Sequence, residues 1–216
     1  SGPLRRDAMP PARTRALGLV RVTEAAALQA ARFVGMGDKE AADQAAVDGM
    51  HAVLHTIHMD GVVVIGEGEK DEAPMLANGE VVGDGTPPYV DIAVDPLDGT
   101  RLTAQGRPNA VSVIALSERG TMFDPGPVFY MEKMAGRDDL VDLLDLDRPL
   151  GKTVELVAER KGVEVRDVMV VVLDRPRHEE GIKAIREAGA RVRLITDGDV
   201  AGALLAAAPD RSVDLL

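Results

Sequence analysis

Residues 90–100 read VDIAVDPLDGT, an apolar, β-branched run that leads into two aspartates three positions apart. The apolar run predicts a buried strand, and Pro96 predicts a stiff bend directly after it. Asp95 at the strand end and Asp98 in the bend can therefore direct their oxygens at one point. In a chain without cysteine, such oxygen ligands favour a hard cation, Mg²⁺ or Mn²⁺.

The two residues after Asp98 extend this motif. Gly99 has no side chain, so the backbone there can approach a phosphate group closely. Thr100 adds a hydroxyl at the start of the following segment. The alternative interpretation is an Asp-rich turn in which Thr100 caps a helix.

Two further carboxylates stand at comparable places. Glu67 lies in IGEGE, residues 65–69, directly after a second apolar run at 62–65. Asp43 lies on the apolar face of a predicted helix, four positions before Val47. The alternatives are a Glu-rich polar turn for Glu67 and a favourable helix-dipole position for Asp43.

The first part of the chain is predicted to be an α+β domain over residues 20–150, after a flexible leader at 1–19. Thr23 is a good N-cap for a helix at 24–34, and Asp38 for a helix that runs to about residue 57. The predicted strands are 62–65, 90–94 and 110–116.

Beyond about residue 150 the pattern changes to alternating helices and strands, which predicts a partial α/β domain at 151–216. The predicted helices are 153–161, 179–188 and one from about 200, and the predicted strands are 168–173 and 192–195. A strand, helix and strand in succession form a right-handed βαβ unit with parallel strands. The loops at 174–178 and 196–199 then leave from strand carboxyl ends, where open α/β sheets bind ligands. The whole chain is therefore predicted to have an α/β fold.

Composition narrows the class of partner. With 25 Lys and Arg against 36 Asp and Glu, the net charge of −11 argues against a nucleic-acid or anionic-membrane binder. An acidic protein that acts on an anionic substrate needs a local cationic device, such as metal ions. The absence of cysteine fits a reducing cytoplasm, and no apolar run is long enough to span a bilayer. The terminal apolar run at 213–216 looks like a strand cut short, so we expect the chain to be part of a longer protein.

The order of these motifs resembles the lithium-sensitive, metal-dependent sugar phosphatases. It is most similar to the bacterial class II fructose-1,6-bisphosphatases of the GlpX type. The segments that carry this resemblance are 37–39 (GDK), 64–69 (VIGEGE), 71–76 (DEAPML), 94–100 (VDPLDGT), 129–133 (FYMEK), 175–178 (RPRH) and 197–201 (DGDVA). The resemblance implies the layered αβαβα fold of those phosphatases, incomplete here at the C-terminus.

The resemblance also implies roles for individual residues. Asp43 and Glu67 would bind one metal ion, and Asp95, Asp98 and the Leu97 carbonyl a second. The candidate catalytic residues are Thr100, Asp43 and Glu67, with Thr100 orienting the attacking water beside an acidic neighbour such as Asp43. The candidate substrate-binding residues are Asp98, Gly99, Thr100, Tyr130, Arg175, Pro176, Arg177, Asp197, Gly198 and Asp199. A further metal-binding glutamate of the family would follow the region that matches 213–216.

The implied reaction is metal-dependent hydrolysis of the 1-phosphate of fructose 1,6-bisphosphate, a step of gluconeogenesis, in a cytoplasmic homo-oligomer. One alternative is the same chemistry on sedoheptulose 1,7-bisphosphate or an inositol phosphate. Another is an inactive metal-binding fragment.

Histidines His51, His55 and His58 are spaced at i, i+4 and i+7, which suits zinc binding. No acidic partner for them is evident in the sequence, so we interpret them as lying beside the apolar face without a metal. His178 is placed beside the substrate as a candidate neighbour.

Overall fold

The computed structural model describes residues 12–67, 75–128, 130–209 and 212–216. The predicted positions at 1–11, 68–74 and Phe129 lie outside these ranges. The chain divides into two compact units, Ser1–Pro127 and Val128–Leu216. The predicted boundary near residue 150 falls inside the second unit, because Leu140 already belongs to that unit's hydrophobic core.

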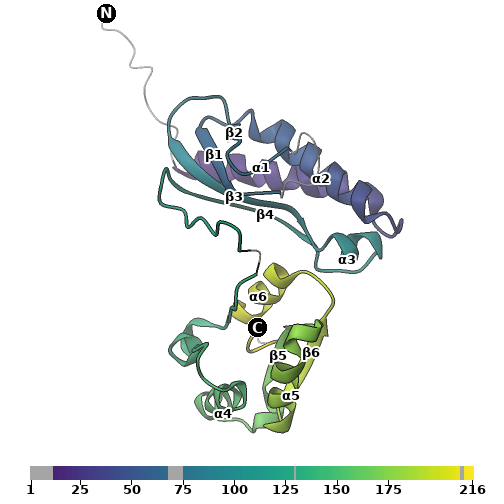
Figure 1. Cartoon of the computed structure of the whole chain (residues 1–216), viewed down its shortest axis with the longest axis vertical. Coiled ribbons are helices and arrows are strands. Elements are labelled where there is room, and N and C mark those ends of the chain that lie inside the picture. Colours follow the sequence, from purple (N-terminus) through teal and green to yellow (C-terminus); the bar gives the residue numbers. More distant parts are fainter. Residues whose placement is uncertain (1–11, 68–74, 129, 210–211) are drawn as a thin grey trace, which may run out of the picture. The chain divides into compact units, whose positions relative to one another are not determined.

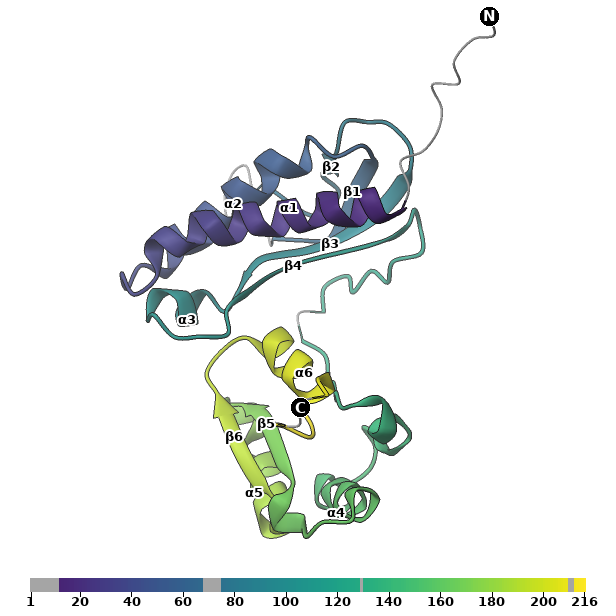
Figure 2. The ribbon, with the colours of Figure 1, turned by 180° about the vertical axis from the view of Figure 1, so that it is seen from behind.

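Unit 1 is a mixed four-stranded sheet with two long helices against one of its faces (Figures 1 and 2). The strand order is β2-β1-β3-β4, in which β1 and β3 are parallel and the other neighbours antiparallel. Its elements are α1 (Ala12–Ala30), the 3-10 helix η1 (Ala31–Phe33), α2 (Lys39–Leu54), β1 (Asp60–Ile65), β2 (Val81–Val82), β3 (Tyr89–Asp98), α3 (Thr100–Ala104) and β4 (Val111–Glu118).

Helix α2 begins as its sequence predicts. The Asp38 side chain accepts a hydrogen bond from the Ala41 backbone N–H at 2.9 Å, which confirms the N-cap. The predicted apolar stripe of Val47, Met50 and Leu54 is buried in the core of unit 1. The helix ends at Leu54, three residues before the predicted end.

Helix α1 differs from its prediction. It starts at Ala12, so residues 12–19 of the predicted leader are helical, and Thr23 lies within the helix rather than at its start. The Thr23 hydroxyl instead donates to the Val20 carbonyl at 3.0 Å. Packing against α2 outweighs the local capping signal: a Cβ on Gly49 would lie 2.7 Å from the Ala25 carbonyl oxygen, so the two helices approach closely.

Unit 2 contains the predicted βαβ unit. Its elements are η2 (Asp138–Leu143), α4 (Leu150–Lys161), η3 (Val165–Asp167), β5 (Met169–Leu173), η4 (Pro176–His178), α5 (Glu179–Glu187), β6 (Arg191–Ile195) and α6 (Asp199–Ala207). Strands β5 and β6 are parallel, as predicted. Successive residues of β5 face opposite cores: Val170 packs with α4 and α5, and Val171 with α6.

The terminal residues 212–216 complete the packing of unit 2. The Leu215 carbonyl accepts from the Val171 N–H at 2.8 Å, and Leu216 exchanges two backbone hydrogen bonds of 2.9 Å with Ala135. Val213 and Leu215 are buried. The predicted strand character of 213–216 therefore appears as extended pairing beside β5. Both units combine helices with sheets, which confirms the predicted α/β class.

Candidate functional site

The end of β3 carries the first pair of carboxylates. The pairing of β3 with β4 shifts register between Asp95 and Asp98, so a bulge separates the two side chains. The Asp95 Oδ1 accepts from the Leu97 N–H at 3.2 Å. Gly99 follows at φ +99°, and a Cβ there would lie 3.1 Å from the Leu102 side chain and 3.2 Å from the Ala110 backbone. Only glycine fits this bend without strain, and the bend leads directly into α3.

The end of β1 places Glu67 at the same edge of the sheet, because β1 and β3 are parallel. The Glu67 N–H donates to the Leu76 carbonyl at 3.0 Å, which fixes the backbone of the loop. Gly66 is required before it, since a Cβ there would lie 2.0 Å from the same Leu76 oxygen. The remainder of the predicted motif, Gly68 and Glu69, lies outside the described residues.

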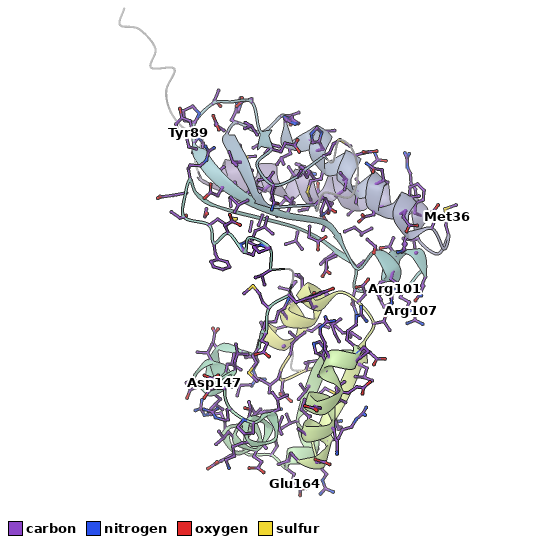
Figure 3. The ribbon with its side chains drawn as sticks, viewed as in Figure 1. Met36, Tyr89, Arg101, Arg107, Asp147 and Glu164 are labelled. Atoms are coloured by element: carbon purple, nitrogen blue, oxygen red, sulfur yellow. The ribbon has the colours of Figure 1, made fainter. Side chains whose placement is uncertain are left out.

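Asp43 comes from the early part of α2, whose start lies beside α3. Just before α2, the Gly35 N–H donates to the Thr103 carbonyl of α3 at 2.9 Å. The Gly37 N–H donates to the Ala104 carbonyl of the same helix, also at 2.9 Å. In Figure 3, Met36 and Arg101 lie at one end of unit 1 and Tyr89, the first residue of β3, at the other. The start of α2 and the carboxyl end of β3 therefore share one end of the unit.

The charges of three predicted carboxylates act on the fourth, Asp95. The pKa of Asp95 is raised from 3.8 to about 7, first by burial and then by the negative charges of Asp98, Glu67 and Asp43. Asp98 itself is only 8% exposed. The negative charges of Asp98, Glu67 and Asp43 disfavour ionisation of Asp95, and a bound cation would remove that repulsion.

This donor set fits the predicted cation. All four side chains offer oxygen, the donor preferred by Mg²⁺ and Mn²⁺, and the cluster contains no softer ligand among the described residues. Leu97 is buried in the same bend. The role of its carbonyl as a further ligand stays a prediction.

In unit 2, the two predicted substrate loops lie side by side because β5 and β6 are parallel neighbours. The Arg175 Nη2 lies 3.9 Å from the Asp197 Oδ1, so the two loops form an ion pair. The Arg177 guanidinium carbon lies 4.5 Å from the ring centroid of Tyr130, in cation–π contact. The structure thus brings Tyr130 and the arginine loop together, and the arginine loop to Asp197.

Lys133 has no predicted role, although it stands in the FYMEK segment at 129–133. Its ammonium group pairs with the Asp199 carboxylate at the start of α6. Gly198, immediately before, adopts φ +79° and forms the N-cap position of that helix. Lys133 lies in the same FYMEK segment as Tyr130, and this shared origin is the only signal in the sequence that could have drawn attention to it.

The rest of the arginine loop is held by local structure. Pro176 opens the 3-10 helix η4, where its lack of an N–H costs nothing. The His178 Nδ1 donates to the Leu173 carbonyl at 2.9 Å. This bond ties one nitrogen of His178 to the end of β5, and the predicted role beside the substrate stays a prediction.

The structure also supplies acidic partners for the three histidines, which the sequence does not reveal. The His51 Nε2 lies 2.8 Å from the Glu80 Oε1, and the His55 Nε2 lies 3.1 Å from the His51 Nε2. The interpretation of these histidines as lacking an acidic partner is therefore wrong for all three. Glu80 directly precedes β2, and its approach depends on the β1–β2 pairing, which no local pattern reveals. His58 instead pairs with Asp84.

Across the described residues, no helix is both long enough and apolar enough to cross a membrane.

Comparison with known proteins identifies the family of this chain. Residues 13–216 match the family model described as bacterial fructose-1,6-bisphosphatase, glpX-encoded. The chain is 50% identical, over 94% of its length, to a protein of Haemophilus influenzae named fructose-1,6-bisphosphatase class 2. It is 44% identical, again over 94%, to fructose-1,6-bisphosphatase 1 class 2 of Escherichia coli strain K12. It spans 61% and 60% of the length of these two relatives. The chain belongs to the bacterial, glpX-encoded fructose-1,6-bisphosphatase family.

Proposed function

We propose that this chain carries the metal-binding and substrate-binding residues of a phosphatase that releases the 1-phosphate of fructose 1,6-bisphosphate, leaving fructose 6-phosphate. The observation that supports it most is the cluster of four carboxylates at the end of β3, where burial and neighbouring charges raise the pKa of Asp95 to about 7. The names of the two relatives supply the substrate.

The carboxylates divide into two sets in this proposal. Asp43 and Glu67 hold one divalent cation, and Asp95, Asp98 and the Leu97 carbonyl hold a second. When bound, Mn²⁺ or Mg²⁺ supplies positive charge to the phosphoryl oxygens and to the departing sugar oxygen.

Hydrolysis breaks the bond between phosphorus and the sugar oxygen, and water supplies the new oxygen. The Thr100 hydroxyl orients that water, and the carboxylate of Asp43 or Glu67 accepts its proton. The departing sugar oxygen takes up a proton to become the 1-hydroxyl. Asp98, Gly99 and Thr100 contact the phosphate that is cleaved, where the bare Gly99 backbone permits a close approach.

The loops of unit 2 bind the remainder of the substrate. Arg175 and Arg177 present rigid guanidinium donors to the phosphate that does not react. Asp197 and Asp199 accept hydrogen bonds from sugar hydroxyls. Tyr130 supports this set by stacking against Arg177, and Pro176 and Gly198 shape the two loops.

In its cellular setting, we expect this activity to serve gluconeogenesis, including carbon that enters from glycerol. We expect it in the cytoplasm and in a homo-oligomer, without a nucleic-acid or membrane partner.

Phosphate release tests the proposal directly. We would compare fructose 1,6-bisphosphate, sedoheptulose 1,7-bisphosphate and inositol 1-phosphate in Mn²⁺, in Mg²⁺ and in chelator. The expected result is metal-dependent release that is fastest with fructose 1,6-bisphosphate and is lost in Asp95→Asn. A matched control is Asp48→Asn, because Asp48 is an exposed carboxylate on the same helix as Asp43 and accepts a hydrogen bond from the Gln44 side chain.

The other outcomes are equally informative. Faster release from a different sugar phosphate would replace the substrate and keep the chemistry. A thermal midpoint that rises with Mn²⁺ while no phosphate is released from any substrate would leave only a metal-binding fragment.

A further inference from the structure

A second cluster of metal-binding side chains lies outside the site described above. His51 lies in the last turn of α2, His55 is the C-cap residue directly after that helix, and Glu80 directly precedes β2. Their ligand atoms all lie within 4.8 Å of one another. None of these three residues belongs to the acidic cluster of Asp43, Glu67, Asp95 and Asp98.

The distances match those of ligands around one small cation. They are 2.8 Å from the His51 Nε2 to the Glu80 Oε1, 3.1 Å between the two Nε2 atoms, and 3.9 Å from the His55 Nε2 to the Glu80 Oε1. A tetrahedral ion with bonds of about 2.0–2.2 Å separates neighbouring ligand atoms by about 3.3–3.6 Å. Shifts of a few tenths of an ångström in three side chains would therefore complete the coordination.

Hydrogen bonds alone cannot satisfy all the polar atoms of this cluster. The His51 Nε2 faces two groups, the His55 Nε2 and the Glu80 Oε1, while it carries at most one proton. If that proton is donated to the Glu80 carboxylate, it cannot also be donated to the His55 Nε2. A cation at the centre interacts favourably with all three lone pairs at once.

The chain also holds the ligands in place. The other oxygen of Glu80, Oε2, accepts the backbone N–H of Leu76, and this second contact orients the carboxylate. His51 and Glu80 are half-buried, with side chains 25% and 23% exposed. His55 is 40% exposed at the end of the helix, which leaves room for entry and for a water molecule as a fourth ligand.

The ligand types select the ion. Two imidazole nitrogens and one carboxylate oxygen form a donor set typical of Zn²⁺, and two histidines at i and i+4 share one helix face. Such nitrogen donors bind Zn²⁺ more strongly than Mn²⁺, and Mg²⁺ prefers oxygen alone. We propose that His51, His55 and Glu80 form a second cation site, specific for Zn²⁺ or a similar transition metal, that ties the end of α2 to the segment before β2.

Calorimetric titration with Zn²⁺ in saturating Mg²⁺ tests this site, because Mg²⁺ occupies the oxygen-rich cluster and leaves imidazoles free. The expected result is one Zn²⁺ per chain and a raised thermal midpoint. His55→Ala should weaken binding at least ~10-fold, since it removes one of three protein ligands. The matched control is His58→Ala, which removes a nearby histidine that pairs with Asp84 instead.

Two further measurements keep the outcome independent of folding and of phosphatase activity. Co²⁺ in place of Zn²⁺ should give visible absorption bands that disappear in Glu80→Gln, a variant that retains an acceptor for the Leu76 N–H. Asp95→Asn should leave Zn²⁺ binding unchanged, whether or not the chain hydrolyses any phosphate. Unchanged Zn²⁺ affinity in both His55→Ala and Glu80→Gln, or no Zn²⁺ uptake in Mg²⁺, would overturn the proposal.

Discussion

The charged side chains of the two candidate regions, one in each unit, are arranged differently. At the end of β3 in unit 1, burial and then the negative charges of Asp98, Glu67 and Asp43 raise the pKa of Asp95 to about 7. In the loops of unit 2, charged groups have favourable partners: Lys133 pairs with Asp199, Arg175 with Asp197, and Arg177 with the ring of Tyr130. The first region has an excess of one sign of charge, and the second is internally balanced.

This difference predicts how each region meets its ligand. The acidic cluster gains from a cation because binding relieves repulsion that already exists. The loops of unit 2 are held in shape before a ligand arrives, but an incoming anion must compete with contacts already made. Substitutions in the acidic cluster should therefore have large effects, and those in the loops graded ones.

The largest effect is expected for Asp98→Asn. This change removes an anionic ligand from the buried bend after β3, and we expect kcat for fructose 1,6-bisphosphate to fall at least ~100-fold. Steady-state phosphate release in Mn²⁺, in a form of the protein shown to be active, measures it. Asp48→Asn is the control and should retain normal turnover. Normal turnover of Asp98→Asn at saturating Mn²⁺ would remove Asp98 from the metal site.

Thr100→Ala should have the next largest effect. The proposed hydroxyl acts on the attacking water, so we expect kcat to fall by ~30-fold while KM stays nearly constant, the sign of an interaction made only in the transition state. Thr100→Ser keeps the hydroxyl and should restore most of the turnover. If the serine variant were as slow as the alanine variant, the methyl group or the start of α3 would matter rather than the hydroxyl.

Arg177→Ala addresses the balanced region. Loss of a guanidinium that contacts the non-reacting phosphate should raise KM by ~10-fold with a smaller change in kcat, because that contact is equal in the ground and transition states. Tyr130→Leu separates the roles: it removes the stacked ring but leaves the charge, so a smaller rise in KM is expected. An unchanged KM in Arg177→Ala would mean that the loop does not contact the substrate.

Much of the fold could be predicted from local pattern. The N-cap at Asp38, the buried stripe through Met50, and the parallel strands β5 and β6 follow from short-range periodicity and are confirmed. The start of α1 could not be predicted, because the capping signal of Thr23 is outweighed by packing against α2 around Gly49.

Part of the candidate site could also be predicted from local pattern. Strand ends and their spacing place Asp95 and Glu67 at one sheet edge, because parallel strands end together. What the sequence could not show is pairing across long separations. Glu80 meets His51 from 29 positions away, and Lys133 meets Asp199 from 66 positions away. Both contacts depend on tertiary packing that has no local signature.

The smallest expected effect is on how the stability of the metal-free chain depends on pH. The pKa of Asp95 is about 7 in the folded state and 3.8 as an ordinary value, so the folded state holds this proton more tightly. Stability from this group is therefore present below about pH 4 and is lost as the pH rises through 7. Asp95→Asn carries no such charge, and its thermal midpoint in chelator should exceed that of the natural sequence by about 2–4 °C at pH 8.

The pH series separates this electrostatic effect from a change in packing. The advantage of Asp95→Asn should vanish towards pH 4, where the natural carboxyl is protonated, and grow as the pH rises. Mn²⁺ should reverse the order at pH 8, because the cation neutralises the natural cluster and binds the variant less well. Scanning calorimetry at several pH values, with chelator and with Mn²⁺, measures both. An advantage of equal size at every pH would show that the amide packs better, and the repulsion among the four carboxylates would then not govern this end of unit 1.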